Sequence, residues 1–156
     1  MNIFYLSRDP ATAAAMHADI HVNKMILESA QLLCTAHHVT GGTAPYKKTH
    51  ENHPCAKWVR QSAEHYRWVL ELAKALGAEY TRRYGRTHKT VAEVLPLLEN
   101  APSALPLGWA EPPQAMPEEF RSTDTVESYR RYYLSKAATM PLLWGRAPEV
   151  PTQFNH

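Results

Sequence analysis

Seven polar side chains recur along the segment between Ala11 and His38 at a spacing that fits one α-helix. At about 100° per residue they fall within an arc of roughly 100°. This polar strip consists of His17, His21, Lys24, Glu28, Gln31, Thr35 and His38. The remaining surface is mostly Ala, Met, Ile, Val, Leu and Cys, whereas an ordinary surface helix carries an apolar stripe on a polar cylinder. We therefore expect a helix buried on most sides, with its polar strip facing a cavity or other polar groups.

Lys24 and Glu28 stand four residues apart in this strip and form a candidate catalytic pair. On an exposed helix they would make an ion pair worth only a few tenths of a kcal/mol. In a partly buried setting, a lysine amine can act as a nucleophile and a carboxylate as a general acid or base. We predict that Lys24 is a nucleophile and that Glu28 is a general acid or base.

His17 and His21 are also four residues apart, a spacing at which two imidazoles can reach one metal ion. No glutamate stands between them to complete a metalloprotease motif. The alternative is that both rings hydrogen-bond to Glu28 or to the backbone. We favour this use without a metal and expect neither a metal nor a cofactor.

Basic and histidine side chains gather in two further places. Asn52 and His53 precede Pro54, where either can cap a helix, and His50 lies just before them in a loop that also carries two lysines. A phosphate at that helix N-terminus is a compatible second use. The remaining basic residues form two groups, one of Lys47, Lys48, Lys57 and Arg60 and one of Arg82, Arg83, Arg86 and Lys89. They fit either a local phosphate-binding face or ordinary solvated charge.

The elements that must position these residues are predicted to be helices throughout. Asp9 and Pro10 start the first helix, which ends before Gly41. Further helices are expected from Pro54 to about Tyr84, over Thr90–Glu99, and from Thr125 to about Ala138 after the cap Asp124. Tyr129 and Tyr133 of the last helix are expected to pack in the core. Residues 1–6 form a strand or an extended arm, 41–53 a loop, 100–120 a proline-rich wrapping loop, and 145–156 a flexible tail.

The bulk properties indicate one all-α domain covering residues 1–156. Its net charge of +2 gives no polyelectrolyte signature. Two cysteines are too few for a disulfide scaffold, and Cys34 is expected in the core. Without a signal peptide or an apolar run of about 20 residues, we expect a cytoplasmic protein with no membrane partner.

Four segments carry a resemblance to a known family. They read MHADIHVNKMILESAQLL, ENHPCAKWVRQSAEHY, EYTRRYGRTHK and EPPQAMPEEFRSTDTVESYRRYY. Over nearly the whole chain they resemble a family of small uncharacterised bacteriophage proteins. More distantly, residues 1–85 resemble the pyrimidine-dimer DNA glycosylase/AP lyase family of endonuclease V type. The shared features are a short aromatic start, a polar-faced first helix, Asn-His-Pro before a long helix, and Arg-Arg-Tyr-Gly at its end.

This resemblance implies a compact helical protein that binds DNA, flips a nucleotide and attacks C1′ of its sugar with an amine, assisted by a carboxylate. In that family the nucleophile is the N-terminal amine left after Met removal, beside an Arg-Glu pair. Here the bulky Asn2 predicts that Met1 is retained, and the region of that pair reads Asn23-Lys24-Met25. The α-amine of Met1 therefore joins Lys24 as a candidate nucleophile.

Together these observations predict an enzyme that acts on DNA or a nucleotide, present in the host cytoplasm if a phage encodes it. The predicted catalytic residues are Lys24, Glu28, His21, His17 and Met1. The predicted substrate-binding residues are Gln31, Asn52, His53, His50, Arg60, Arg82, Arg83 and Arg86. Two alternatives are a transferase that tailors hypermodified phage bases and a non-catalytic accessory protein that binds nucleic acid or a host factor.

Overall fold

All the regular elements in the part of the chain that the structure describes are helices, which confirms the predicted all-α class. The computed structural model describes residues 2–145 and 150–155. Its α-helices are α1 (Pro10–Met16), α2 (Asp19–Val39), α3 (Pro54–Val59), α4 (Ala63–Tyr84), α5 (Lys89–Glu93) and α6 (Thr125–Ser135). Its 3-10 turns are η1 (Leu95–Leu98), η2 (Glu118–Phe120), η3 (Lys136–Ala138) and η4 (Thr152–Asn155).

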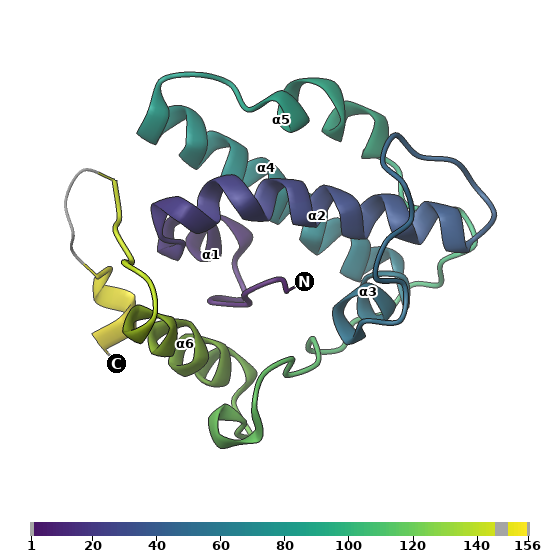
Figure 1. Ribbon diagram of the computed structural model, residues 1–156. Helices are drawn as coiled ribbons and strands as arrows, with labels where there is room; N and C mark the ends of the chain where they lie inside the picture. Colours follow the sequence, from purple (N-terminus) through teal and green to yellow (C-terminus); the bar gives the residue numbers. More distant parts are fainter. Residues whose placement is uncertain (1, 146–149, 156) are drawn as a thin grey trace.

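The two longest helices, α2 and α4, pack against each other at the centre of the molecule (Figure 1). α1 also lies against α4, and α3 contacts both central helices. α2 is buried along most of its length, as its apolar majority predicted, and Cys34 is in the core as expected. Gly77 of α4 allows α5 to approach closely, because a Cβ there would stand 2.7 Å from Val91 Cγ2.

The first predicted helix starts and ends as expected but is divided in two. Asp9 caps α1 by accepting a hydrogen bond from the Thr12 N–H at 3.0 Å, and Pro10 follows in the first turn. The prediction of one helix from Ala11 to His38 is wrong, because the backbone is extended at His17 and Ala18. This segment contains neither glycine nor proline, so nothing in its local sequence predicts the break.

The second predicted helix, from Pro54 to Tyr84, is also divided in two. α3 ends at Val59, and Ser62 caps α4 by accepting a hydrogen bond from the His65 N–H at 3.1 Å. The end of α4 is as predicted, with Gly85 in the left-handed conformation at a φ of 71°. The predicted helix over 90–99 is likewise shorter, as α5 gives way to η1.

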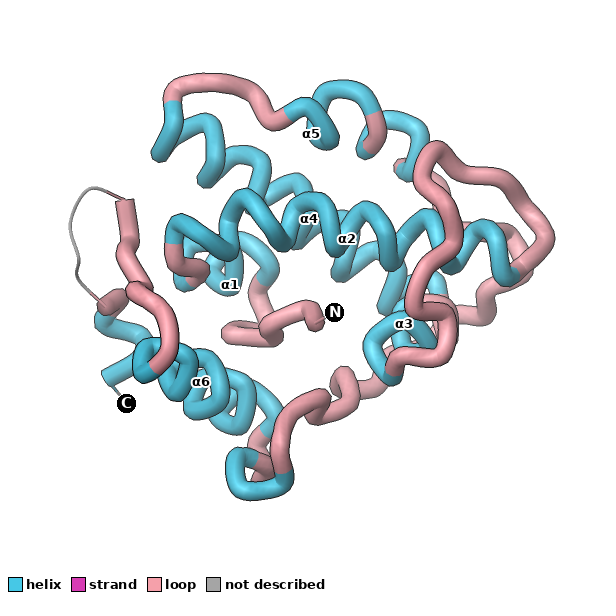
Figure 2. The backbone as a smooth tube through the Cα atoms, in the orientation of Figure 1, coloured by secondary structure: helices cyan, strands magenta, loops and turns pink. Residues whose placement is uncertain are grey.

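The proline-rich segment between η1 and η2 runs along one side of the molecule, as expected, from α3 toward α6 (Figure 2). The indole N–H of Trp58 donates to the Ala110 carbonyl at 2.9 Å, and the Tyr129 hydroxyl donates to the Pro113 carbonyl. Tyr129 and Tyr133 are fully buried, which confirms their predicted packing role. Of the predicted flexible tail, residues 146–149 and 156 lie outside the described residues.

Candidate active site

A cavity of about 300 Å³ opens beside the N-terminal half of α2. This size is at the lower end of the range typical of small-molecule sites, about 300–1,000 Å³. Its wall combines residues of α2, of the chain start and of α6 and its continuation, η3. The lining residues are Asn2, Phe4, His21, Lys24, Met25, Glu28, His53, Ala115, Tyr132, Lys136 and Met140.

The cavity brings together three of the predicted catalytic residues and one predicted binding residue. His21, Lys24 and Glu28 follow one another at intervals of three and four residues on α2 and therefore share one face of the helix. His53 lines the same cavity from the N-terminus of α3. The N-terminal part of the polar strip thus faces a cavity.

The C-terminal part of the polar strip has a different task, because it anchors the 41–53 loop. Thr35 Oγ1 both donates to the Thr49 carbonyl and accepts from the Thr49 N–H, each at 3.1 Å. His38 Nε2 donates to the Tyr46 carbonyl at 2.8 Å. Gln31 lies between the two parts, half-buried, and is not among the residues that line the cavity.

The start of the chain is folded tightly against the cavity wall. The side-chain carbonyl of Asn2 accepts hydrogen bonds from the backbone N–H groups of Ile3 at 2.7 Å and Phe4 at 2.9 Å. Its amide group donates to the Ala115 carbonyl at 3.0 Å. Phe4 has a φ of 40°, which is costly for a non-glycine residue and is held by this side-chain clamp. Met1 lies outside the described residues.

His21 is a neutral hydrogen-bond donor in this setting. Burial, together with the positive charges of Lys136 and Lys24, lowers the pKa of His21 to about 4. The Tyr133 hydroxyl accepts from the Ala18 N–H at 2.8 Å and lies 2.7 Å from His21 Nδ1. Because Ala18 occupies one lone pair of this oxygen, we assign the hydroxyl proton to a bond with Nδ1. The ring proton of neutral His21 then sits on Nε2.

His53 is fixed in a similar way. Its Nδ1 accepts from the Cys55 N–H at 3.0 Å and caps α3, so the predicted choice between Asn52 and His53 falls on His53. Burial also lowers the pKa of His53. Since Nδ1 accepts, the proton of the neutral ring is on Nε2. Asn52 itself is exposed and does not line the cavity.

Lys136 is a cavity residue that the sequence did not reveal. Its ammonium nitrogen lies 4.7 Å from the centre of the Tyr132 ring and 5.6 Å from that of Phe4. These distances fit cation–π contacts, which stabilise a lysine over aromatic faces. The signal that could have found it is the spacing of Tyr132 and Lys136, which stand four residues apart while Tyr129 and Tyr133 turn inward.

The prediction that His17 shares the face of Lys24 is wrong, because His17 ends α1 and does not belong to α2. Its ring is fully buried, and Nδ1 donates to the Ala13 carbonyl at 2.7 Å, one of the two uses the sequence left open. Burial lowers the pKa of His17 to about 3, so the ring is neutral. Nε2 is buried without a hydrogen-bond partner among the described residues.

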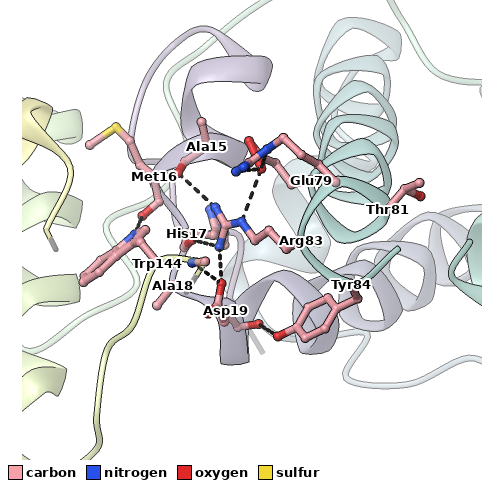
Figure 3. A network of polar contacts seen from close by, with 12 residues as sticks. Ala15, Met16, His17, Ala18, Asp19, Glu79, Thr81, Arg83, Tyr84 and Trp144 are labelled. Atoms are coloured by element: carbon pink, nitrogen blue, oxygen red, sulfur yellow. Dashed lines mark hydrogen bonds and ion pairs between the residues drawn. The ribbon is translucent and has the colours of Figure 1, made fainter. Parts of the chain in front are cut away.

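Arg83, another predicted phosphate-binding residue, does not line this cavity; its side chain is 3% exposed and holds the break between α1 and α2 (Figure 3). It donates to the carbonyls of His17 at 2.7 Å and Ala15 at 3.2 Å. It also pairs with Asp19 at 2.9 Å and Glu79 at 3.2 Å. Its guanidinium thus contacts four acceptor groups of the protein, and Arg83 also lines the hollow described below.

Two more hydrogen bonds complete this network around the break. The Trp144 indole N–H donates to the Met16 carbonyl at 2.8 Å (Figure 3). Asp19 Oδ1 accepts from the Gly145 N–H at 2.7 Å. A second hollow, of about 540 Å³, lies beside this network. Arg82 lines it and forms an exposed ion pair with Glu79 at 2.6 Å.

The other predicted binding residues do not line the candidate active site. His50 is exposed, and its Nδ1 lies 2.7 Å from Thr49 Oγ1. Arg60 ends α3 and is half-buried. Arg86 donates to the Tyr80 hydroxyl at 3.1 Å. The side chains of His50 and Arg86 thus contact residues close to them in the sequence.

Three further findings concern metal binding, membrane-spanning helices and the relatives of this chain. Among the described residues, no three His, Cys, Asp or Glu side chains are grouped so that they could hold a metal ion. None of the helices in the described ranges is both long and apolar enough to cross a membrane. Comparison of the chain with protein-family models, curated proteins and solved structures found no match.

Proposed function

We propose that this protein is an enzyme that acts on DNA or a nucleotide, with an amine that attacks C1′ of the sugar and a glutamate that transfers protons. The observation that carries this proposal is the joint placement of Lys24 and Glu28 in one cavity, which Asn2 also lines. An amine beside a carboxylate is the pair of groups that covalent attack at a sugar carbon needs.

In the proposed reaction, the amine lone pair forms a bond to C1′ while the glycosidic bond from C1′ to the base breaks. The electron pair of that bond leaves with the base, which is protonated by the carboxylic acid form of Glu28. The resulting carboxylate then takes the proton that the attacking amine releases. The C1′–O4′ bond then breaks, O4′ takes the proton now held by Glu28, and the opened adduct is a protonated imine, which water hydrolyses to release the amine.

Two amines are candidates for the nucleophile, the side chain of Lys24 and the α-amine of Met1. An α-amine has an ordinary pKa of about 8, against about 10.4 for a lysine side chain. At neutral pH a larger share of an α-amine is therefore in the nucleophilic form. Lys24 lines the cavity, and Met1 directly precedes Asn2, which lines it too.

His21 supplies a fixed N–H donor in this proposal. Its neutral ring, with the proton on Nε2, can donate to an oxygen of the base or of the sugar without adding positive charge. The Tyr133 hydroxyl holds the opposite ring nitrogen, so the donor needs little reorganisation during the reaction. We infer an orienting role for His21 and leave the proton transfer to Glu28.

Borohydride trapping tests this proposal, because hydride reduces the protonated imine to a stable secondary amine. The substrates are DNA duplexes that carry a pyrimidine dimer, an abasic site or a hydroxymethylated pyrimidine. We expect a covalent protein–DNA product whose peptide map places the adduct on Lys24 or Met1. Glu28→Gln should slow its formation, and Lys57→Ala, an exposed lysine of α3, serves as the control.

The outcomes separate the three functions considered from the sequence. A base altered in place, with no abasic product, would identify a transferase. Binding without any reaction on the whole panel would identify an accessory protein. The amine mechanism fails if no adduct forms while Lys24→Ala and the N-terminally acetylated protein both keep full activity.

A further inference from the structure

The side of the cavity that Phe4 and Tyr132 form also contains Lys136. We propose that Lys136, held on the rings of Phe4 and Tyr132, is the residue of the cavity that binds a phosphate group of the ligand. This inference rests on the proposed nucleotide-directed function and names the group of the nucleotide that the cavity recognises.

The first support is the way in which Lys136 is held. Its ammonium lies over two ring faces, and it forms no ion pair with a carboxylate among the described residues. Lys48, Lys74 and Lys89 each stand within 4.0 Å of a glutamate. Ring faces restrict the ammonium without neutralising its charge, so its donors remain suited to an anion.

The second support is the charge of the cavity wall. Apart from the phenol of Tyr132, its described ionisable side chains are two lysines, one glutamate and two histidines whose pKa values lie below the ordinary range. With both rings neutral, the lysines outnumber the glutamate and the wall has a net positive charge. Burial first, and then the positive charges of Lys136 and Lys24, lower the pKa of His21. An anionic group is therefore favoured over a neutral one.

The third support is the number of donors that surround the space. Lys136, Lys24 and the Nε2–H of His21 offer N–H groups to the same cavity, and Glu28 is its one acidic side chain among the described residues. A phosphate presents several acceptor oxygens and binds a lysine ammonium as a point charge. We assign the phosphate to Lys136 and leave Lys24 beside Glu28 for the chemistry at the sugar.

Binding measurements on the intact protein test this assignment without any reaction. The probes are thymidine, thymidine 5′-monophosphate, inorganic phosphate and the dinucleotide TpT, titrated by calorimetry and NMR. We expect at least one phosphate-bearing probe to bind about tenfold or more tightly than thymidine, the size expected for a hydrogen bond to a charged group. A preference for the monophosphate indicates a free nucleotide, and a preference for TpT indicates the DNA backbone.

Variants then identify the residue responsible. Lys136→Gln should remove most of the preference for phosphate, Lys136→Arg should keep part of it, and the exposed control Lys89→Gln should keep all of it. The thermal unfolding of each variant shows whether it is folded. If Lys136→Gln does not fold, the wild-type protein still provides a test, because a bound phosphate near Lys136 should raise the pKa of His21.

Two results would overturn the assignment. One is equal binding of thymidine and of every phosphate-bearing probe by the wild-type protein. The other is an unchanged preference in folded Lys136→Gln, or an unchanged His21 pKa on phosphate binding. Neither depends on borohydride trapping: a trapped adduct without a phosphate preference would leave the proposed reaction in place, and the reverse result would leave only the phosphate site.

Discussion

Arg83 on α4 and Lys136 in η3 each place a positive charge beside α2, but the fold uses the two charges differently. Arg83 is buried, and its donors are shared between two carboxylates and two backbone carbonyls. Lys136 faces a cavity, with ring faces as its described contacts. A planar guanidinium can join several fixed acceptors at once, whereas a lysine is a flexible point charge. The comparison separates a cation that maintains the fold from one that is open to a ligand.

The largest expected effect is on the Arg83 side of this comparison. Arg83→Met should lower the free energy of unfolding by about 3–5 kcal/mol, the usual cost of leaving a buried ion pair without one partner. Urea denaturation measures this loss. The neighbouring Arg82→Met removes an exposed ion pair and should cost less than about 0.5 kcal/mol. Similar losses in the two variants would contradict the structural role of Arg83.

Tyr133→Phe connects the two regions, because the Tyr133 hydroxyl accepts from Ala18 at the helix break and holds His21 at the cavity. Removal of the hydroxyl leaves the buried Ala18 N–H without its partner and should cost about 1–3 kcal/mol. It also frees His21 Nδ1. The ¹⁵N shifts of the His21 ring should show one Nε2–H tautomer in the wild-type protein and a mixture in the variant. Unchanged shifts would disprove our tautomer assignment.

The low pKa of the buried His17 predicts how the stability of the protein changes with pH. Its pKa is about 3 in the folded chain against an ordinary 6.5, so the unfolded chain binds more protons between these values. Stability should therefore fall as the pH drops from about 6.5 toward 3, by at most about 1.4 kcal/mol per pH unit for one proton.

His17→Asn keeps an amide donor for the Ala13 carbonyl but does not titrate. Its free energy of unfolding should depend less steeply on pH across this range. The slope should be smaller by up to about 1.4 kcal/mol per pH unit, which corresponds to one proton. Urea midpoints measured at intervals from pH 7 to pH 3.5 give both slopes. Parallel curves for the wild-type protein and the variant would show that His17 does not contribute.

The smallest effect is expected on the cavity side. Lys136→Gln should lower the free energy of unfolding by no more than about 1 kcal/mol, since the side chain forms no described ion pair and only its cation–π contacts are lost. The pKa of His21 should rise in this variant, because one of the positive charges that oppose the imidazolium is gone. An NMR titration measures the shift, with Lys89→Gln as the control. A lowered or unchanged pKa would show that Lys136 does not act on His21.

Local sequence signals located most of the helix ends. Asp9, Asp124 and Gly85 cap helices where the sequence predicted them. The break before α4 also had a signal, because Ser62 is a good N-cap residue two positions ahead of Glu64. The apolar spacing continues across Ser62, however, and predicts one uninterrupted helix.

Of the residues that line the candidate site, the sequence predicted three on α2 and His53. His21, Lys24 and Glu28 share a face because of their spacing, which any α-helix imposes. Phe4 and Lys136 reach the same cavity from segments more than 100 residues apart in the chain. No short-range pattern could have brought them together.

The sequence by itself determined that α2 is a mostly apolar helix with one polar strip, since helical periodicity depends only on residue spacing. The tertiary structure decided where that helix begins and what its polar strip faces. At the break, carbonyls and an N–H group that a continuous helix would pair internally are bound by Arg83, Trp144 and Tyr133. The residues around the break, Ala15 and Ala18 among them, favour a continuous helix locally. Side chains from distant segments instead form hydrogen bonds with the backbone groups left open at the break, and this offsets the cost of the interruption.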